Sequence, residues 1–205
     1  FIQKRVNKEA QKKNMDIATR RQSILGTNQY PNTSEHLSSA PTTQHKRTND
    51  AGIELLLPYR GAEAFEEIRL KTDAYAKDHP RPKVWMFTYG NLAMRKARAQ
   101  FAGNFFGCAG FEIVDNLGFP TIEKGISAAK EAKPDIIVIC SSDEEYADIA
   151  IPVYEALKDQ AVIVLAGYPK ELVDQFKKAG IEHFIHIKTN ALDALSSYQH
   201  LIGIK

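Results

Sequence analysis

The chain has 205 residues, of which 43% are apolar and 25% are charged, and its formal net charge is +2. These values are typical of a globular protein, and no apolar run approaches the roughly 18 residues that cross a bilayer, so no membrane role is expected. The sequence opens on Phe1 without an initiator methionine or a signal-peptide pattern, which indicates a piece of a longer polypeptide. Cys108 and Cys140 lie in apolar stretches, which predicts buried, reduced thiols and a reducing compartment, the cytoplasm.

The positive charge is concentrated near the start of the chain. Residues 1–50 contain nine Lys or Arg and four Asp or Glu, a local balance of +5 within a total of +2, so the rest of the chain carries −3. A nucleic-acid-binding face would combine a basic stripe with interleaved aromatic side chains on a folded surface. The cations here lie on one helix-like stretch without such aromatics, so nucleic acid is not an expected partner.

The first eighty residues show a helix, a polar stretch and a second helix. Apolar residues recur at helical spacing over residues 2–21, and residues 23–26 follow as a possible short strand. Residues 31–50 are almost devoid of large apolar side chains and rich in Ser, Thr, Asn and Pro, which predicts a linker or an extended wrap. Residues 53–57 are strand-like, and residues 61–79 have the pattern of a helix that ends at the prolines after it.

From residue 83 onward, short apolar runs alternate with helical stretches, which is the sequence form of a parallel sheet. We expect five strands, over residues 84–88, 111–114, 136–140, 162–166 and 183–187. Each is followed by a helix, near residues 92–107, 121–132, 143–158, 169–179 and 190–202. Since crossovers between parallel strands are right-handed, these units predict an α/β fold with a doubly wound, flavodoxin-like, five-stranded parallel sheet in the order 2-1-3-4-5.

Several helix starts carry their usual signals. Ser142 and Glu145 form a possible capping box, in which the two side chains each accept from the other residue's backbone amide. Pro169 suits a first helical turn, and Asn190 precedes the last helix. These signals support the expected order of elements.

Open α/β sheets bind ligands beyond the carboxyl ends of their strands, which directs attention to loops 89–95, 141–144 and 167–169. The carboxylates with which a receiver domain holds a metal and accepts phosphate are absent there. Residues 88–91 are a weak version of a flavin-phosphate loop, and an ordinary strand-to-helix turn is the preferred interpretation. No catalytic set is recognised in these loops.

Two further groups of charged or metal-ligating residues were considered for binding. His183 and His186 do not suggest a metal site, because period-two alternation along the last expected strand puts them on different faces. Arg95, Lys96 and Arg98 lie in the first turns of a helix, where positive charge opposes the macrodipole. They could meet a partner's carboxylates or a phosphate, although side chains that reach into solvent are the preferred interpretation.

Three segments resemble methylmalonyl-CoA mutases, and in particular the small (beta) subunit of the bacterial two-subunit enzyme. They are residues 60–66 (RGAEAFE), 98–106 (RAQFAGNFF) and 110–113 (GFEI). Residues 25–32 (LGTNQYPN) are similar to the segment that closes the mutase barrel. The polar stretch after them resembles the connection to the cobalamin-type domain, so the resemblance covers essentially the whole chain.

The resemblance implies a division of the chain into four parts. Residues 1–30 would end a barrel domain, residues 31–60 would form the linker, and residues 61–82 would hold a connecting helix. Residues 83–205 would form a cobalamin-binding-like α/β domain.

Cobalamin-binding members of the family carry D-x-H-x-x-G after the first strand, in which the His coordinates cobalt and the Asp orients that His. The matching positions here are Ala93, Arg95 and Arg98, so none of the three residues is retained. A guanidinium offers donors only, so Arg95 cannot be a ligand. Arg98 puts bulk where the family needs glycine to admit the nucleotide tail of the cofactor.

The other contacts of the family's pocket are only partly retained. Ser141 remains from a Ser-x-Leu motif, the Leu position is Asp143, and a Gly-Gly pair corresponds to Ala166 and Gly167. The resemblance therefore implies a degenerate pocket with no catalytic, cofactor-binding or metal-binding residue. Its positions are Ala93, Arg95, Arg98, Ser141, Asp143, Ala166 and Gly167.

The function that the resemblance implies is a non-catalytic subunit of methylmalonyl-CoA mutase, an isomerase that interconverts methylmalonyl-CoA and succinyl-CoA. The holoenzyme would use adenosylcobalamin for the radical chemistry, with none bound to this chain. The expected partner is the large catalytic subunit, and Phe105, Tyr89 and residues 1–60 are the expected partner-facing surface.

Two other functions stay open. The first is a cobalamin-binding module without a His ligand, in which Tyr89, Ser141 and Gly167 hold the cofactor. The second is a regulatory module that senses a CoA thioester or a nucleotide through the basic helix start.

Overall fold

The computed structural model describes residues 2–35 and 60–205. Its helices are α1 (Ile2–Ala18), α2 (Glu63–Tyr75), α3 (Leu92–Gly107), α4 (Ile122–Ala132), α5 (Tyr146–Leu157), α6 (Val173–Lys178) and α7 (Ala191–Leu201). Its strands are β1 (Lys83–Thr88), β2 (Glu112–Val114), β3 (Ile136–Cys140), β4 (Val162–Ala166) and β5 (His183–Ile185). All strand pairs are parallel and their order is β2-β1-β3-β4-β5, which confirms the predicted fold class.

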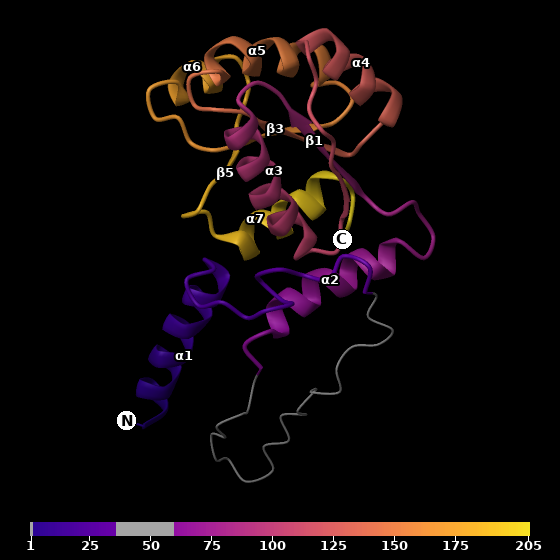
Figure 1. Ribbon diagram of the computed structural model, residues 1–205. Helices are drawn as coiled ribbons and strands as arrows, with labels where there is room; N and C mark the ends of the chain where they lie inside the picture. The colour runs from indigo at the N-terminus through magenta and orange to yellow at the C-terminus, as the bar shows by residue number, and fades with distance from the viewer. Residues whose placement is uncertain (1, 36–59) are drawn as a thin grey trace.

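The sheet is covered by helices on both faces (Figure 1). Helices α4, α5 and α6 form one layer, whose core includes Phe87, Ile149 and Phe176. Helices α3 and α7 form the other layer, and α2 packs beneath them, so this second core extends from Met86 to Phe65. The central strand β3 is buried along its whole length because both layers cover it.

The segment that follows α1 folds back onto α3. Asn28 is buried, and its side-chain amide donates to the carbonyls of Ile17 and Gln22, both at 2.9 Å. Arg20 lies over the ring of Phe105, with its Cζ atom 5.9 Å from the ring centroid. The early part of the chain therefore packs on the α3 layer, whereas α1 itself extends away from the body (Figure 1).

Phe105 belongs to the interior of the chain. Its side chain is only 1% exposed, because it packs against Phe106 and under Arg20. The prediction that Phe105 faces a partner is wrong, because Arg20 and its neighbours in the segment after α1 cover the Phe105 side chain. The predicted strand at residues 53–57 lies outside the described residues.

Several predicted boundaries are corrected by the local geometry of the backbone. Helix α1 stops at Ala18 rather than near residue 21, because Arg20 has a positive φ of 61°. Residues 23–26 do not form a strand, because Leu25 makes only a single isolated bridge to Gln29 across a turn that begins at Gly26. Helix α2 is shorter than predicted and ends at Tyr75.

The end of the sheet is also shorter than predicted. Strand β2 begins one residue later than expected, after Phe111, and strand β5 ends at Ile185. The backbone amide of His186 then donates to the side-chain oxygen of Thr189 at 2.9 Å, which turns the chain away from the sheet. Helix α6 begins only at Val173, after a turn whose amides donate to the Pro169 carbonyl.

Asparagine caps set the starts of two helices that frame the carboxyl edge of the sheet. The side chain of Asn91 accepts from the amides of Ala93 and Met94, both at 3.1 Å, and so begins α3. The side chain of Asn190 accepts from the amide of Asp193, which confirms the predicted start of α7. Across residues 2–35 and 60–205, no helix is both long and apolar enough to cross a membrane.

Candidate functional site

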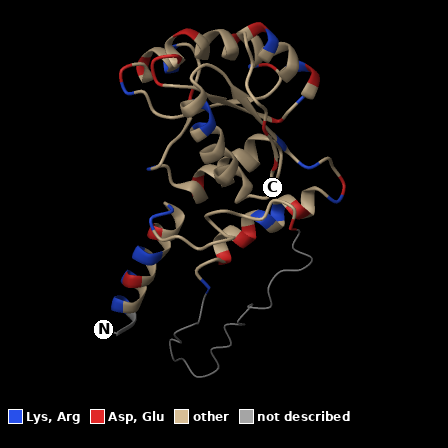
Figure 2. Ribbon diagram, in the orientation of Figure 1, with Lys and Arg blue, Asp and Glu red and all other residues tan. Residues whose placement is uncertain are grey.

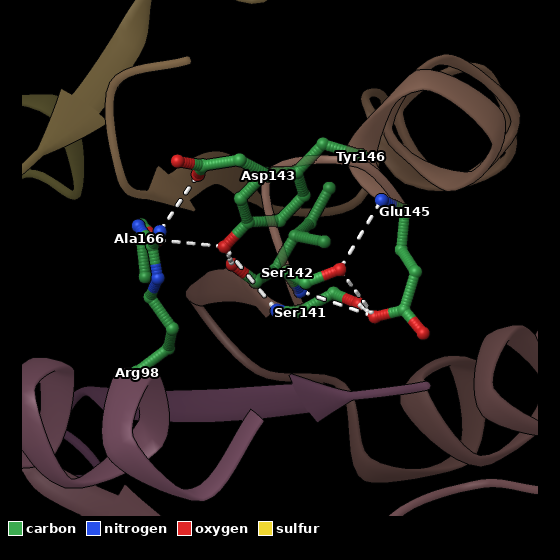
Figure 3. A network of polar contacts seen from close by, with 8 residues as sticks. Arg98, Ser141, Ser142, Asp143, Glu145, Tyr146 and Ala166 are labelled. Carbon is green, nitrogen blue, oxygen red and sulfur yellow. Dashed lines mark hydrogen bonds and ion pairs between the residues drawn. The ribbon is translucent and has the colours of Figure 1, made fainter. Parts of the chain in front are cut away.

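The loops that follow β1, β3 and β4 meet at the carboxyl edge of the sheet, beside the start of α3. Figure 3 shows this edge, with Arg98 reaching from α3 toward the loops after β3 and β4. This is where a doubly wound sheet of this order holds its ligands. The positions singled out in the sequence lie here, so the contacts of their side chains decide whether a cavity exists.

Arg98 spans the space between α3 and the two loops. Its Nη1 donates to the Ala166 carbonyl at 2.5 Å, and its Nη2 forms an ion pair with Asp143 at 2.7 Å. The guanidinium also lies over the ring of Tyr146, 5.7 Å from the centroid. Only 19% of the side chain is exposed, so the residue is built into the edge rather than extended into solvent.

Tyr146 closes the same space from the interior. The residue is fully buried, and its hydroxyl donates to the Ala166 carbonyl at 2.6 Å while accepting from the Ser141 amide at 3.2 Å. Burial raises the pKa of the Tyr146 hydroxyl well above its usual value. The phenol therefore serves as a neutral hydrogen-bond bridge between the loops after β3 and β4.

Glu145 joins the loops after β1 and β3. Its carboxylate accepts from the Asn91 amide at 2.8 Å, from the Ser141 hydroxyl at 2.6 Å and from the Ser142 amide at 3.1 Å. Burial by itself raises the pKa of Glu145, but these hydrogen bonds outweigh it and hold the pKa below its usual value. The ionised Glu145 carboxylate therefore accepts hydrogen bonds from the backbone amides of Asn91 and Ser142 at this edge.

The capping box predicted from Ser142 and Glu145 is present. The Ser142 hydroxyl accepts from the Glu145 amide at 3.3 Å, and the Glu145 carboxylate accepts from the Ser142 amide. The regular helix begins only at Tyr146, because residues 143–145 form a turn before it. The reciprocal pair therefore fixes the loop and the first helical turn together.

Two glycines allow these side chains to approach the backbone. A Cβ atom at Gly167 would lie 1.9 Å from Nη1 of Arg98, and one at Gly90 would lie 2.2 Å from Oε1 of Glu145. Both separations are far below van der Waals contact, so the two positions tolerate only glycine while those side chains stay in place. Arg98 and Glu145 of this chain therefore take up the space next to these two glycines, and a hollow of about 430 Å³ remains beside Arg98, Ala166 and Gly167.

Arg95 is held apart from Arg98, on the outer side of the loop after β1. Its guanidinium donates to the carbonyl of Gly90 at 2.9 Å and to that of Leu117 at 3.0 Å, which ties the loops after β1 and β2 together. Asn116 accepts from the amide of Gly118 at 2.9 Å in the same loop. The preferred prediction of solvent-directed arginines is wrong for Arg95 and Arg98, because backbone carbonyls satisfy them within the chain.

The structure brings together five of the seven degenerate-pocket positions. Arg98 donates hydrogen bonds to Asp143 and to the Ala166 carbonyl, and Gly167 lies against Arg98. The Ser141 hydroxyl donates to the neighbouring Glu145. The remaining two lie apart: Ala93 is exposed in the first turn of α3, and Arg95 faces the loop after β2.

Sequence reasoning did not assign Tyr146 or Asn116 to this edge, and it treated Glu145 only as a capping residue. The signal for Tyr146 was available, since a polar-tipped aromatic residue at the first position of a helix next to a buried strand needs an acceptor. The acceptor itself, the Ala166 carbonyl, becomes its neighbour only through the fold.

The nucleophilic and metal-ligating side chains do not form a reaction centre. Cys140 is buried, which raises the pKa of its thiol, and burial raises the pKa of Cys108 to about 11. His183 packs against Tyr198, whereas His186 lies beyond the strand and packs against Tyr168. Within the described parts of the chain, no three His, Cys, Asp or Glu side chains are placed to hold a metal ion.

Comparisons with known proteins point to one family. A methylmalonyl-CoA mutase small subunit from Porphyromonas gingivalis is 44% identical over the whole chain, which spans 33% of that relative. A probable methylmalonyl-CoA mutase small subunit from Mycobacterium tuberculosis is 31% identical over 92% of the chain and 29% of the relative. A methylmalonyl-CoA mutase small subunit from Streptomyces virginiae is 30% identical over 87% of the chain and 29% of the relative. The chain thus spans about a third of the length of these relatives.

Among solved structures, a cobalamin-binding protein from Desulfitobacterium hafniense is similar over 71% of this chain and 72% of its own, at 22% identity and a TM-score of 0.45. No argument rests on that score, and the fold class of this chain is established by its own sheet order. No family model matches the chain. Because relatives at least 30% identical align with most or all of its length, the chain belongs to the methylmalonyl-CoA mutase small subunit family.

Proposed function

We propose that this chain is part of a non-catalytic subunit of an adenosylcobalamin-dependent methylmalonyl-CoA mutase, that it supports assembly and stability of the enzyme, and that it binds no cobalamin itself. Its partner would be the large subunit, which would hold the cofactor and isomerise methylmalonyl-CoA and succinyl-CoA. The free, buried thiols of Cys108 and Cys140 fit a reducing compartment, so we place the subunit in the cytoplasm.

The observation that carries this proposal is the position of Arg98. In the cobalamin-binding pattern a glycine at this place admits the nucleotide tail, whereas here a guanidinium crosses the space to the Ala166 carbonyl and to Asp143. A neutral, buried tyrosine hydroxyl, that of Tyr146, binds the same carbonyl from the other side. We infer that the residues present do not fit the cofactor, because the Arg98 guanidinium crosses the place of its tail and is held there by the Ala166 carbonyl and Asp143.

The position of the lower cobalt ligand leads to the same conclusion. Arg95 stands where the pattern has histidine, and a guanidinium has no lone pair to give to a metal. The hydrogen bonds of Arg95 to the carbonyls of Gly90 and Leu117 also hold the loops after β1 and β2 together. The division into a barrel end over residues 1–30, a linker, a connecting helix and the domain from residue 83 remains part of the proposal.

The two other functions considered from the sequence have less support. A cofactor held without a His ligand would require Arg95 and Arg98 to break their hydrogen bonds to three backbone carbonyls and one carboxylate. Each hydrogen bond of a charged group contributes about 1.5–3 kcal/mol, so this rearrangement would be costly. A CoA or nucleotide sensor would use the cations at the start of α3, but two of these three are already bound within the chain.

The proposal predicts the cofactor content of the assembled enzyme. Co-expression with the large subunit of the same organism, followed by saturation with adenosylcobalamin and removal of the free cofactor, is expected to leave one cobalamin per pair of subunits. Absorbance against protein concentration by amino-acid analysis measures this ratio. Two cobalamins per pair, or full mutase activity of the large subunit without this chain, would contradict the proposal.

A further inference from the structure

Residues 29–35, which we call the strap, cross the end of α3 and reach α2 (Figure 1). Pro31 and Thr33 lie so close to Gly107 that a Cβ atom there would be 3.0 Å and 3.1 Å from their side chains. The end of α3 and the turn after it, residues 105–110, are buried. The strap is therefore part of what covers this end of the helix.

Two polar side chains of the body hold the strap, one near each of its ends. The side chain of Asn104, on α3, accepts from the Tyr30 amide at 2.9 Å. Arg69, on α2, is only 6% exposed and donates to the carbonyls of Asn32 and Glu35, the latter at 2.6 Å. Side chains of the body thus anchor the backbone of the strap through hydrogen bonds.

Apolar packing contributes little to the attachment of the strap. Each of its residues is at least partly exposed, and Tyr30 is 68% exposed. A hollow of about 390 Å³ remains between the strap and a wall formed by α3 and the end of β2. Segments with few buried apolar contacts open at a lower free energy than the core beside them.

The closed position of the strap also strains its backbone. Tyr30 has a positive φ of 49°, a left-handed conformation that residues other than glycine rarely adopt. Such a conformation persists only where the surroundings impose it, as the Asn104 anchor and the turn before Tyr30 do here. Opening of the strap would relieve this strain.

Cys108 lies next to the strap and close to its α2 anchor. It follows Gly107, on which the strap packs, and it is only 2% exposed. Burial raises the pKa of its thiol to about 11, and the nearby charges of Arg20 and Arg69 oppose this rise. Cys140 is fully buried in the central strand β3. The two thiols therefore report on different parts of the molecule.

From these features we infer that the strap is a latch, which opens as a unit while the sheet stays folded and gives solvent access to the end of α3 and to Cys108. Arg69 and Asn104 keep the latch closed. Its state changes how firmly the early part of the chain is joined to the α/β body. The inference does not rest on the proposed function, since the anchors lie on α2 and near the end of α3, whereas the carboxyl edge adjoins the start of α3.

Native-state thiol labelling tests the latch. The chain is treated with iodoacetamide at urea concentrations below the unfolding transition, and peptide mass spectrometry follows Cys108 and Cys140 separately. Without urea, Cys108 is expected to react faster than Cys140 by at least on the order of tenfold. The rate for Cys108 should hardly depend on urea, because opening of the strap exposes little surface, whereas the rate for Cys140 should rise steeply, because it requires the sheet to unfold.

The α2 anchor is tested by Arg69→Met, which removes the hydrogen bonds to the strap and keeps a long buried side chain. The urea-independent labelling of Cys108 is expected to become faster by at least on the order of tenfold, since one hydrogen bond of a charged group contributes about that factor to an equilibrium constant. The control Lys77→Met removes the same charge from an exposed position just after α2 and should react as the native chain does.

The α3 anchor is tested by Asn104→Ala. Labelling of Cys108 is expected to become about fivefold faster, because a neutral hydrogen bond contributes less than a charge-assisted one. Gln100→Ala lies one turn earlier on α3 at an exposed position, and this control should leave the rate unchanged.

The native chain by itself can overturn the inference. Equal rates and equal urea dependence for Cys108 and Cys140 would show that both thiols become accessible only when the whole chain unfolds, so that the strap does not open alone. Labelling of Cys108 in Arg69→Met at the rate of Lys77→Met would show that Arg69 does not hold the strap closed.

Discussion

At the scale of single residues, the carboxyl edge is closed by pairing within the chain. The Ala166 carbonyl accepts from a charged donor, Arg98, and from a neutral one, Tyr146, so both of its lone pairs are used. Glu145 in turn takes the amide and hydroxyl donors of the loops after β1 and β3. These groups are therefore satisfied by neighbours within the chain.

Glu145→Gln is expected to lower the free energy of unfolding at pH 7 by about 1–2 kcal/mol, because the charge-assisted hydrogen bonds to Asn91, Ser141 and Ser142 become neutral ones. The pKa of Glu145 is lowered in the folded state, so its contribution is present above the unfolded pKa of about 4.3 and is lost as pH falls through the lower folded value.

Urea unfolding between pH 7 and pH 3 measures this effect. The difference in stability between the native chain and Glu145→Gln should begin to shrink below about pH 4.3, the unfolded pKa, and should be smallest at pH 3. The exposed Glu171→Gln on the loop after β4 is the matched control and should follow the native curve. A constant difference between Glu145→Gln and the native chain at all pH values would contradict the assigned role.

At the scale of elements, strand order, helix order and most of the boundaries were predictable because they depend on local patterns. The apolar run of β3 and the asparagine before α7 are read directly from neighbouring residues. The length of β5 was not predictable, because the strand ends where the Thr189 hydroxyl accepts a hydrogen bond from the His186 amide. Phe105 was misplaced for a similar reason, since the segment that covers it is distant in sequence.

The contact between α4 and the sheet depends on one glycine. A Cβ atom at Gly125 would lie 2.6 Å from the ring of Phe87, which is itself fully buried and cannot move away. Gly125→Ala should therefore cost about 1–3 kcal/mol of overpacking, which exceeds the gain of about 1 kcal/mol in helix propensity. Thermal unfolding measures the difference.

The exposed Ser127→Ala on the same helix provides the control for helix propensity alone. It should leave the melting temperature unchanged or slightly raised. A Gly125→Ala chain as stable as Ser127→Ala would show that α4 does not pack on β1 as closely as the structure has it.

At the scale of the whole molecule, we propose that a ligand-binding architecture is retained while its ligand site is replaced by internal contacts. The sheet order places the loops after β1, β3 and β4 together, and the family resemblance implies that the residues of a cobalamin pocket are missing from them. What fills the space was not predictable from the sequence, because the partners of Arg98 lie 45 and 68 residues away.

We propose that this chain carries no cobalamin, and a visible-spectrum titration tests this most directly. The purified chain is titrated with adenosylcobalamin and with hydroxocobalamin, beside the variant Ala93→Asp/Arg95→His/Arg98→Gly, which restores the missing motif. The native chain is expected to leave both cobalamin spectra unchanged at every ratio. Stoichiometric binding by the native chain with a shifted cobalamin spectrum would contradict the account, because it would show that Arg98 leaves the pocket open.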